Sequence, residues 1–235
     1  MSYKAIIFDL DNTLLNFELC ERQAILGALK ACSISLDLYR ISETIFLQVF
    51  ETHNSQFWKQ RDRFSPSKIT EMSYQSTFND LNININKTSY LSRSFWDIFN
   101  HSAVTEPGVY ELLTVLEGSY RLAVITNGFV SAQVPRMQSV GIAHFFEEIV
   151  VSEAIGFAKP SPEIFHHTLS KLDLTAVQVL YVGDSLSYDY TGATQVNIDF
   201  CYYNRKNQAL PQEVQPRFVI NQLLKLLELV RSPSL

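Results

Sequence analysis

The sequence has little of what marks several classes of protein. It contains three cysteines in 235 residues, Cys20, Cys32 and Cys201, and they are scattered without the spacing of a metal site. Scattered thiols of this kind are typical of a reducing compartment rather than of a disulfide framework. No apolar run reaches the length that crosses a membrane, and the short run before Asp9 does not have the pattern of a signal peptide. We therefore expect a soluble, cytoplasmic protein with no membrane partner.

Basic residues are also scarce. The net charge is −5 and the isoelectric point is about 5.5. Surfaces that bind nucleic-acid polymers or anionic lipids need clustered Lys and Arg, so the composition argues against both partners while allowing one small anionic ligand. Hydrophobic residues, in contrast, make up 46% of the chain. That is enough to bury a large core, either as one domain or as a core with an insert.

Short apolar runs bounded by turns recur along the chain, and each is followed by a segment that can be read as helical. This alternation predicts an α/β fold whose parallel strands are covered on both faces. The predicted strands are 5–8, 122–125, 149–151, 179–182 and 200–203. Helices are predicted to begin at Ser161-Pro162, around 105–107 and near Ser131, where Pro135 would fall in the first turn, and another is predicted over 221–230.

Residues 16–100 have a different pattern. Apolar residues recur there at spacings of three and four, as at Ile41, Ile45 and Val49, and Ser65-Pro66 predicts a helix start. We therefore expect a helical insert of about four helices in 16–100, and a core formed by 1–15 together with 101–235. Most aromatic residues of the insert are expected to be core, with one or two available to stack on a substrate.

Polar clusters follow the predicted strands or lie in loops beside them. Since the carboxyl ends of parallel strands share one edge of a sheet, and ligands bind outside that edge, we expect these clusters to meet. Each cluster alone could be an ordinary turn, but four in this order favour a site. Their members are Asp9 and Asp11, then Thr126, Asn127 and Gly128, then Lys159, and finally Asp184 and Asp189.

The chemistry of these groups is consistent. Several carboxylates packed together need a cation, and hard oxygen ligands in this number suit Mg²⁺. The Thr126 hydroxyl, free amides around Asn127 and Gly128, and the Lys159 ammonium suit the oxygens of a phosphoryl group. One carboxylate can attack phosphorus, and a second can protonate the leaving oxygen and then activate water.

In their order, these motifs resemble those of the haloacid dehalogenase-like (HAD) hydrolase superfamily. The residues that carry the resemblance are Phe8-Asp9-Leu10-Asp11-Asn12-Thr13-Leu14, Thr126-Asn127-Gly128, Lys159-Pro160, and Gly183-Asp184-Ser185 with Asp189. The resemblance covers the chain outside the insert. It implies a Rossmann-like, doubly wound parallel core with an α-helical cap domain inserted after the first motif.

The resemblance also implies roles for single residues. Asp9 would be the nucleophile and Asp11 the general acid and base. Thr126 would bind the phosphoryl group, and Lys159 would hold nucleophile and phosphate together.

For the metal, the resemblance implies Mg²⁺ held by the Asp9 carboxylate, the Asp11 backbone carbonyl and Asp184. Asp189 would orient either Lys159 or a metal-bound water.

A narrower resemblance points to one branch of capped phosphatases. Three features are similar to those of pyrimidine 5′-nucleotidases. They are the segment Thr126-Asn127-Gly128-Phe129, the pair Gln133 and Arg136, and Ser152-Glu153 ahead of Gly156-Phe157-Ala158-Lys159-Pro160. The function predicted is a Mg²⁺-dependent phosphomonoesterase, acting through an aspartyl-phosphate on a small phosphorylated metabolite such as a nucleoside 5′-monophosphate. The enzyme is expected to be a monomer or a homodimer.

The motifs leave five alternatives to weigh. A sugar-phosphate phosphatase or a phosphomutase shares all four motifs. A phosphonate hydrolase would need a marked cap lysine, and none is marked. A dehalogenase lacks the second acid, so Asp11 argues against it. A non-catalytic phospho-ligand-binding protein would be expected to lose motif residues, and none is lost.

Overall fold

A parallel sheet forms the centre of the protein, as the sequence predicted. The computed structural model describes residues 3–61 and 63–231. Within them six strands run in the order β3-β2-β1-β4-β5-β6, and every neighbouring pair is parallel. The strands are β1 (Ala5–Phe8), β2 (Arg121–Thr126), β3 (Glu148–Val151), β4 (Val179–Gly183), β5 (Asp199–Tyr203) and β6 (Phe218–Ile220). This order is that of a Rossmann-like, doubly wound fold.

Ten α-helices accompany the sheet in the described ranges. Four of them, α1 (Phe17–Ala31), α2 (Glu43–Trp58), α3 (Pro66–Asp80) and α4 (Thr88–His101), follow β1 directly. The others are α5 (Val109–Glu117), α6 (Val130–Ser139), α7 (Ser152–Ile155), α8 (Pro162–Lys171), α9 (Thr191–Gln195) and α10 (Leu226–Arg231). Over the described part of the chain, none of the helices combines the length and apolarity that crossing a bilayer requires.

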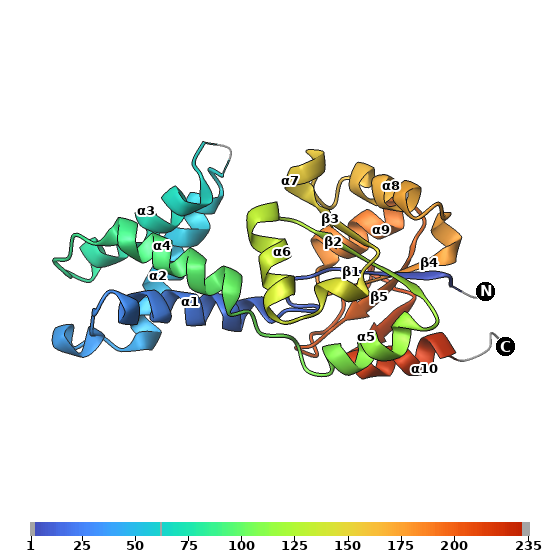
Figure 1. The fold of residues 1–235 in the computed structure, drawn as a ribbon, viewed down its shortest axis with the longest axis horizontal. Coiled ribbons are helices and arrows are strands. Elements are labelled where there is room, and N and C mark those ends of the chain that lie inside the picture. Colours follow the sequence, from blue (N-terminus) through green and yellow to red (C-terminus); the bar gives the residue numbers. More distant parts are fainter. Residues whose placement is uncertain (1–2, 62, 232–235) are drawn as a thin grey trace. The chain divides into compact units, whose positions relative to one another are not determined.

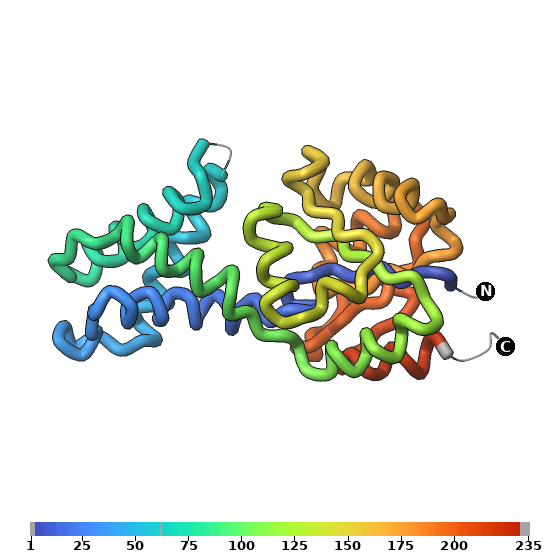
Figure 2. Tube along the Cα trace, in the orientation of Figure 1, coloured from blue at the N-terminus to red at the C-terminus, as the bar shows by residue number. Residues whose placement is uncertain are grey.

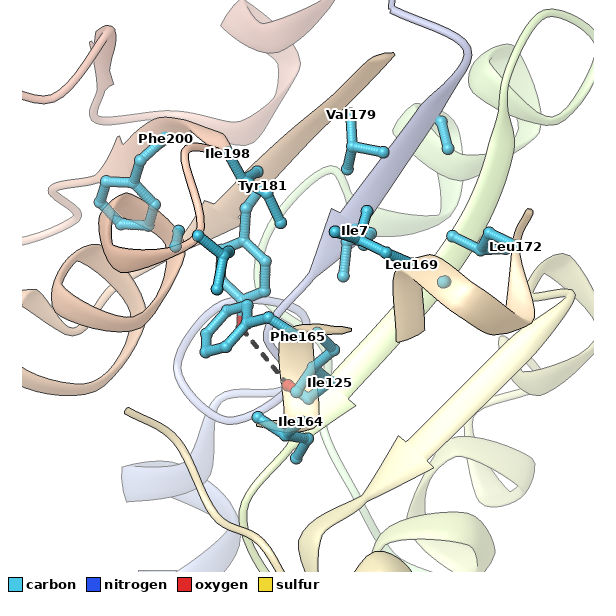
Figure 3. Packing of buried hydrophobic residues seen from close by; sticks show 14 of the residues in the cluster. Ile7, Ile125, Ile164, Phe165, Leu169, Leu172, Val179, Tyr181, Ile198 and Phe200 are labelled. Atoms are coloured by element: carbon cyan, nitrogen blue, oxygen red, sulfur yellow. Dashed lines mark hydrogen bonds between the residues drawn. The ribbon is translucent and has the colours of Figure 1, made fainter. Parts of the chain in front are cut away.

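Helices cover both faces of the sheet, with α8 and α9 on one side and α5 and α10 on the other (Figure 1). Because side chains alternate along a strand, Ile7 of β1 points to the α8 face. There it packs in one buried cluster with residues of β2, β4, α8 and β5, among them Ile125, Tyr181, Phe165 and Phe200 (Figure 3). Covering on both faces explains why β1 reads as four buried apolar residues without alternation.

The chain divides into two compact units. One consists of 1–17 with 104–235 and contains the sheet, and the other is 18–103 and contains most of α1 together with α2, α3 and α4. The chain leaves the core after β1 and returns to it ahead of α5 (Figure 2). At this point the outgoing and returning segments pair, since the Asn16 amide donates to the Val104 carbonyl at 2.8 Å and the Glu106 amide to the Leu14 carbonyl at 2.9 Å. The neck, defined as residues 14–16 and 104–106, therefore belongs to the core.

The helical unit has a core of its own. Phe46 and Phe50 of α2 pack against Tyr74 and Phe78 of α3, with neighbouring ring centroids 4.8–6.5 Å apart. Ser65 caps α3 as predicted, because its side chain accepts from the Lys68 amide. The aromatic residues at these positions are thus structural.

Three sequence expectations about elements need correction. Pro135 is the sixth residue of α6, not part of its first turn, so it cannot donate to the Ser131 carbonyl as an interior residue would. The helix predicted over 221–230 is shorter, with a 3₁₀ turn at Leu223–Lys225 before α10. Strand β6 was not predicted, because its three residues, FVI, are too short for a periodic signal.

Candidate active site

The predicted polar residues meet at the carboxyl edge of the sheet. Asp9 follows β1, Thr126 is the last residue of β2, and Asp184 follows Gly183 at the end of β4. Strands β1 and β4 are neighbours at the point where the strand order reverses direction. In doubly wound folds this switch point is where ligands bind, because the connecting loops diverge there.

Lys159 is the centre of the arrangement. Its ammonium nitrogen Nζ donates to Asp9 Oδ1 at 2.5 Å, to Asp189 Oδ1 at 2.8 Å and to the Ile125 carbonyl at 3.0 Å. The Tyr181 hydroxyl also lies 3.1 Å from this nitrogen. Burial by itself lowers the pKa of Lys159, but the carboxylates of Asp189 and Asp9 raise it further, so the net pKa is above the ordinary value and the ammonium stays charged.

The loop that carries Lys159 is tied to the end of β2. The Asn127 side chain donates to the Lys159 carbonyl at 3.0 Å and accepts from the Lys159 amide at 2.8 Å. These paired bonds fix the lysine backbone, so in this structure the Asn127 side chain tethers a neighbouring loop. From the sequence, free amides were expected around Asn127 and Gly128. The Gly128 amide is not free, because it donates to Ser152 Oγ at 3.0 Å.

Asp189 lies on the π-helical turn Leu186–Tyr190 that follows β4. Besides its bond to Lys159 it accepts from the Ser185 amide at 3.0 Å and from the Tyr181 hydroxyl at 3.0 Å. Three donors from the protein therefore hold this carboxylate. Of the two roles considered for Asp189, this geometry supports orientation of Lys159.

Asp9, Asp184 and Asp189 form a carboxylate cluster that could hold a metal ion, with one oxygen from each lying within 4.8 Å of the others. Burial, together with the neighbouring carboxylates, raises the pKa of Asp9, and Lys159 only partly opposes this. Burial and Asp189 likewise raise the pKa of Asp184 to about 7. These raised pKa values reflect carboxylates that outnumber the single ammonium beside them, so the hard oxygen donors and the shortage of positive charge both fit a divalent cation such as Mg²⁺.

Asp11 lies on a tight loop, in which the Leu14 and Leu15 amides both donate to the Leu10 carbonyl at 2.8 Å. Its carboxylate contacts α6: Arg136 Nη1 lies 2.7 Å from Asp11 Oδ1, and Gln133 Nε2 donates to Asp11 Oδ2 at 2.9 Å. The side chain is partly exposed, in contrast to that of Asp9. Asp11 therefore belongs to the same edge but is held by different partners.

Three residues that contact the predicted site residues had no site role predicted from the sequence: Tyr181, Gln133 and Arg136. Tyr181 sits at an inward position of a buried strand, where a tyrosine is indistinguishable from a core aromatic. Gln133 and Arg136 entered only as part of the narrower resemblance. Their spacing of three, which places them on one helix face, was the available signal.

Comparison with known proteins agrees with this geometry. Residues 6–203 match the model of the haloacid dehalogenase-like hydrolase family. The pyrimidine 5′-nucleotidase YjjG of Escherichia coli is 25% identical over 233 residues, covering 98% of this chain and 99% of that protein. The N-acylneuraminate-9-phosphatase of Rattus norvegicus is 24% identical over 239 residues, covering 97% and 94%.

Among solved structures, the magnesium-bound HAD-hydrolase YfnB of Bacillus subtilis superposes with a TM-score of 0.81 at 23% identity, covering 99% of this chain and 100% of that one. The fold, the order of the motifs and the match over most of the chain lead to one conclusion. The chain belongs to the haloacid dehalogenase-like hydrolase family.

Proposed function

We propose that this hydrolase is a Mg²⁺-dependent phosphomonoesterase that forms an aspartyl-phosphate on Asp9. The observation that carries the proposal is the buried ion network in which Lys159 contacts both Asp9 and Asp189. It holds a nucleophile and a positive charge side by side, close to the end of β2 where Thr126 lies. An attacking carboxylate and a nearby fixed cation are the main needs of phosphoryl transfer through a covalent intermediate.

In the first step an Asp9 carboxylate oxygen forms a bond to phosphorus while the bond from phosphorus to the leaving oxygen breaks. Lys159 contacts Asp9 and offers its charge to the phosphoryl oxygens. The Thr126 hydroxyl is positioned to donate to one of these oxygens. Asp11 gives its proton to the leaving oxygen, so the product leaves as an alcohol.

In the second step Asp11, now ionised, takes a proton from water. The resulting hydroxide attacks phosphorus, the bond from phosphorus to Asp9 breaks, and inorganic phosphate is released. Both carboxylates then return to their starting state, because Asp9 is again a free carboxylate and Asp11 has regained its proton. This use of one group as acid and then as base requires its carboxylate to stay close to the reacting oxygen.

The residues proposed to hold Mg²⁺ are Asp9 and Asp184, with the backbone carbonyl of Asp11 as a third oxygen. Such an ion, when bound, supplies positive charge that offsets the carboxylates and the phosphate. Asp189 supports the site indirectly, because its carboxylate is bonded to Lys159, Ser185 and Tyr181.

A nucleoside 5′-monophosphate is the proposed substrate, supported by the nucleotidase relative that spans the whole chain. A sugar phosphate is the second candidate, because the relative that acts on N-acylneuraminate 9-phosphate, by its name, is similar over nearly the same length. The paired acids Asp9 and Asp11 favour either of these over dehalogenation of carbon, which does not need a proton donor for the leaving group.

A phosphate-release screen tests the proposal. The full-length protein is assayed with nucleoside monophosphates, sugar phosphates and p-nitrophenyl phosphate in Mg²⁺, and again in excess EDTA. We expect release that requires Mg²⁺ and disappears in the Asp9→Asn variant. Transfer of phosphate between positions of a sugar, without release, would identify a mutase instead. Activity that survives EDTA would contradict the metal assignment.

A further inference from the structure

Helix α6 places two buried polar side chains against the candidate site that the mechanism above does not use. They are Gln133, 3% exposed, and Arg136, 0% exposed. Burying a guanidinium is costly unless its partners are well placed, so a buried arginine points to a specific arrangement around it. Three of the contacts made by this pair lead to Asp11 and Thr126, both assigned to the site.

Gln133 bridges the first and second motifs. Its Nε2 donates to Thr126 Oγ1 at 2.6 Å and to Asp11 Oδ2 at 2.9 Å, and the Asn127 carbonyl lies 3.2 Å away. Its other amide atom, Oε1, accepts from Arg136 Nη1 at 2.8 Å. Gly128 permits this placement, because a Cβ there would lie 3.2 Å from the Gln133 amide carbon on a backbone with φ of +147°.

Arg136 determines which way the Gln133 amide faces. A guanidinium can only donate, so the amide atom beside it must be the oxygen. The nitrogen of the amide is therefore directed at Thr126 and Asp11. Because Arg136 also contacts Asp11 Oδ1 at 2.7 Å, the two oxygens of that carboxylate are held by two residues of one helix turn.

This orientation sets the role of the Thr126 hydroxyl. The hydroxyl oxygen accepts from the Gln133 amide, so its own proton is directed to another acceptor. In this structure that acceptor is the Asn127 carbonyl at 3.4 Å, which is long for an O–H donor. A phosphoryl oxygen, which carries negative charge and can only accept, is a better partner for that proton.

We propose that Gln133 and Arg136 are positioning residues that make Thr126 a hydrogen-bond donor to the phosphoryl group and hold the Asp11 carboxylate in place. The inference rests on the proposed phosphomonoesterase function. It goes beyond that function because a single side-chain amide, that of Gln133, would both direct the Thr126 hydroxyl to the phosphate and hold the acid Asp11 in place. Neither residue touches the reacting atoms in this account, and both act through Thr126 and Asp11.

The substitution Gln133→Glu is the sharpest test. It keeps size and shape, and it can keep the bond to Arg136, so the packing of this position is preserved. It removes the amide donor, however, so the Thr126 proton would be drawn to the new carboxylate, and Asp11 would face a like charge. We expect kcat/KM for p-nitrophenyl phosphate to fall by roughly tenfold or more, and inhibition by inorganic phosphate to weaken by a similar factor.

The matched control is Gln138→Glu, which makes the same change at an exposed position of the same helix. It should leave both quantities within about twofold of the wild type, a change too small for a lost hydrogen bond. A double-mutant cycle of Gln133→Met with Thr126→Val, read as inhibition by inorganic phosphate, tests whether Gln133 acts through the hydroxyl. We expect Gln133→Met to weaken inhibition in the wild-type background and to have little further effect once the hydroxyl is gone.

The outcomes separate this inference from the function on which it rests. If the wild type releases no phosphate from p-nitrophenyl phosphate, the proposed function fails. If the wild type is active but Gln133→Glu behaves like Gln138→Glu, the positioning role is wrong while the function stands. Should Gln133→Glu fail to fold, the cycle with Gln133→Met decides, and additive effects in that cycle would overturn the inference.

Discussion

At the scale of single residues, Asp9 and Asp11 stand two positions apart but have different surroundings. Asp9 is buried beside Lys159, whereas Asp11 is partly exposed and contacts Gln133 and Arg136. The proposed mechanism needs Asp9 ionised to attack and Asp11 protonated to deliver a proton, whereas without a metal ion burial raises the pKa of Asp9 and Arg136 lies beside Asp11. A cation bound beside Asp9 would favour the ionised form of that carboxylate, which is what its role as nucleophile requires.

Asp11→Asn should separate the two roles. The variant keeps the nucleophile but can neither protonate a leaving group nor activate water, and positioned acid–base catalysis is typically worth ~10²–10⁴-fold. We expect a loss of that order with an alkyl phosphate. With p-nitrophenyl phosphate, whose leaving group hardly needs a proton, rapid-quench measurement should show a burst of phosphoenzyme followed by slow hydrolysis. Wild-type turnover of this substrate would refute the division of roles.

The raised pKa of Asp184 gives the metal-free protein a defined pH dependence. Burial and Asp189 bring this pKa to about 7, whereas an unfolded aspartate titrates near ~3.9. The folded state therefore keeps a proton that the unfolded state has lost, so the free energy of unfolding falls as pH rises from about 4 to 7. The raised pKa of Asp9 acts in the same direction.

Urea unfolding in EDTA at pH 5 and pH 8 measures this effect. The midpoint should be lower at pH 8, and Mg²⁺ added at pH 8 should raise it, because a bound cation stabilises the ionised carboxylates. Asp184→Asn, which cannot ionise at this position, serves as the control and should show a smaller difference between the two pH values. A metal-free protein that gains stability from pH 5 to pH 8 would show the sign to be wrong.

The sequence predicted the positions of Asp9, Asp184 and Lys159 well, because strand ends and loops are recognisable from apolar runs and turns. It could not predict the partners of Asp11. Those depend on the direction of side chains on α6, which is decided by how that helix packs and not by spacing alone. Tyr181 shows a second limit, since it packs in the core cluster (Figure 3) while its hydroxyl contacts Lys159 and Asp189.

At the scale of elements, the end of β4 depends on the absence of a side chain at Gly183. A Cβ there would collide with the Asp189 carboxylate, which lies over the strand on the following π-helical turn. The close approach lets Asp189 reach both Lys159 and Tyr181. The glycine of the fourth motif is thus explained by packing against Asp189.

Gly183→Ala should therefore lower activity through Asp189. Overpacking of this kind typically costs about 1–3 kcal/mol of stability, and here the group displaced is the partner of Lys159. We expect a lower urea midpoint and a clear loss of kcat. Gly118→Ala is the matched control, because a Cβ at Gly118 would meet nothing within 4 Å. Equal activity of the two variants would contradict this explanation.

Element boundaries show where sequence reasoning fails physically. The five predicted strands lie within the observed ones because buried parallel strands are continuous apolar runs between turns. The position of Pro135 was mispredicted, because α6 begins at Val130 and continues past the proline to Ser139. Strand β6 contributes three residues at the edge of the sheet. It is recognised by its pairing with β5 and not by a pattern in its own sequence.

At the scale of the whole molecule, the chain passes between the core and the helical unit 18–103 at two places, both next to the neck. The core motifs are assigned to the phosphoryl group, so the leaving group must be recognised elsewhere. We therefore propose that 18–103 is the cap that selects the substrate. The helical insert expected from the sequence was 16–100.

A chimaera tests this role. The segment between the paired neck residues is replaced by the corresponding segment of a family member that hydrolyses sugar phosphates. Because the neck bonds are made by core backbone, we expect the chimaera to fold and its order of preferred substrates to change. Hydrolysis of p-nitrophenyl phosphate serves as the control for an intact core. A folded, active chimaera with the original preference would show that the core selects the substrate.

The central place of β1 in the sheet also has a consequence for how the protein is made. This strand is synthesised first, yet its neighbours β2 and β4 follow only after the helical unit. About 120 residues separate β1 from the end of β2, so at ~5–20 residues per second the strand waits on the order of ten seconds for a partner. During this interval the apolar strand β1 has no neighbouring strand to pair with. The helical unit needs no later part of the chain, because it consists of one continuous segment, 18–103. Nascent chains stalled so that residues 18–103 but not β2 have left the ribosome should therefore hold a structured helical unit and a strand β1 open to chaperones.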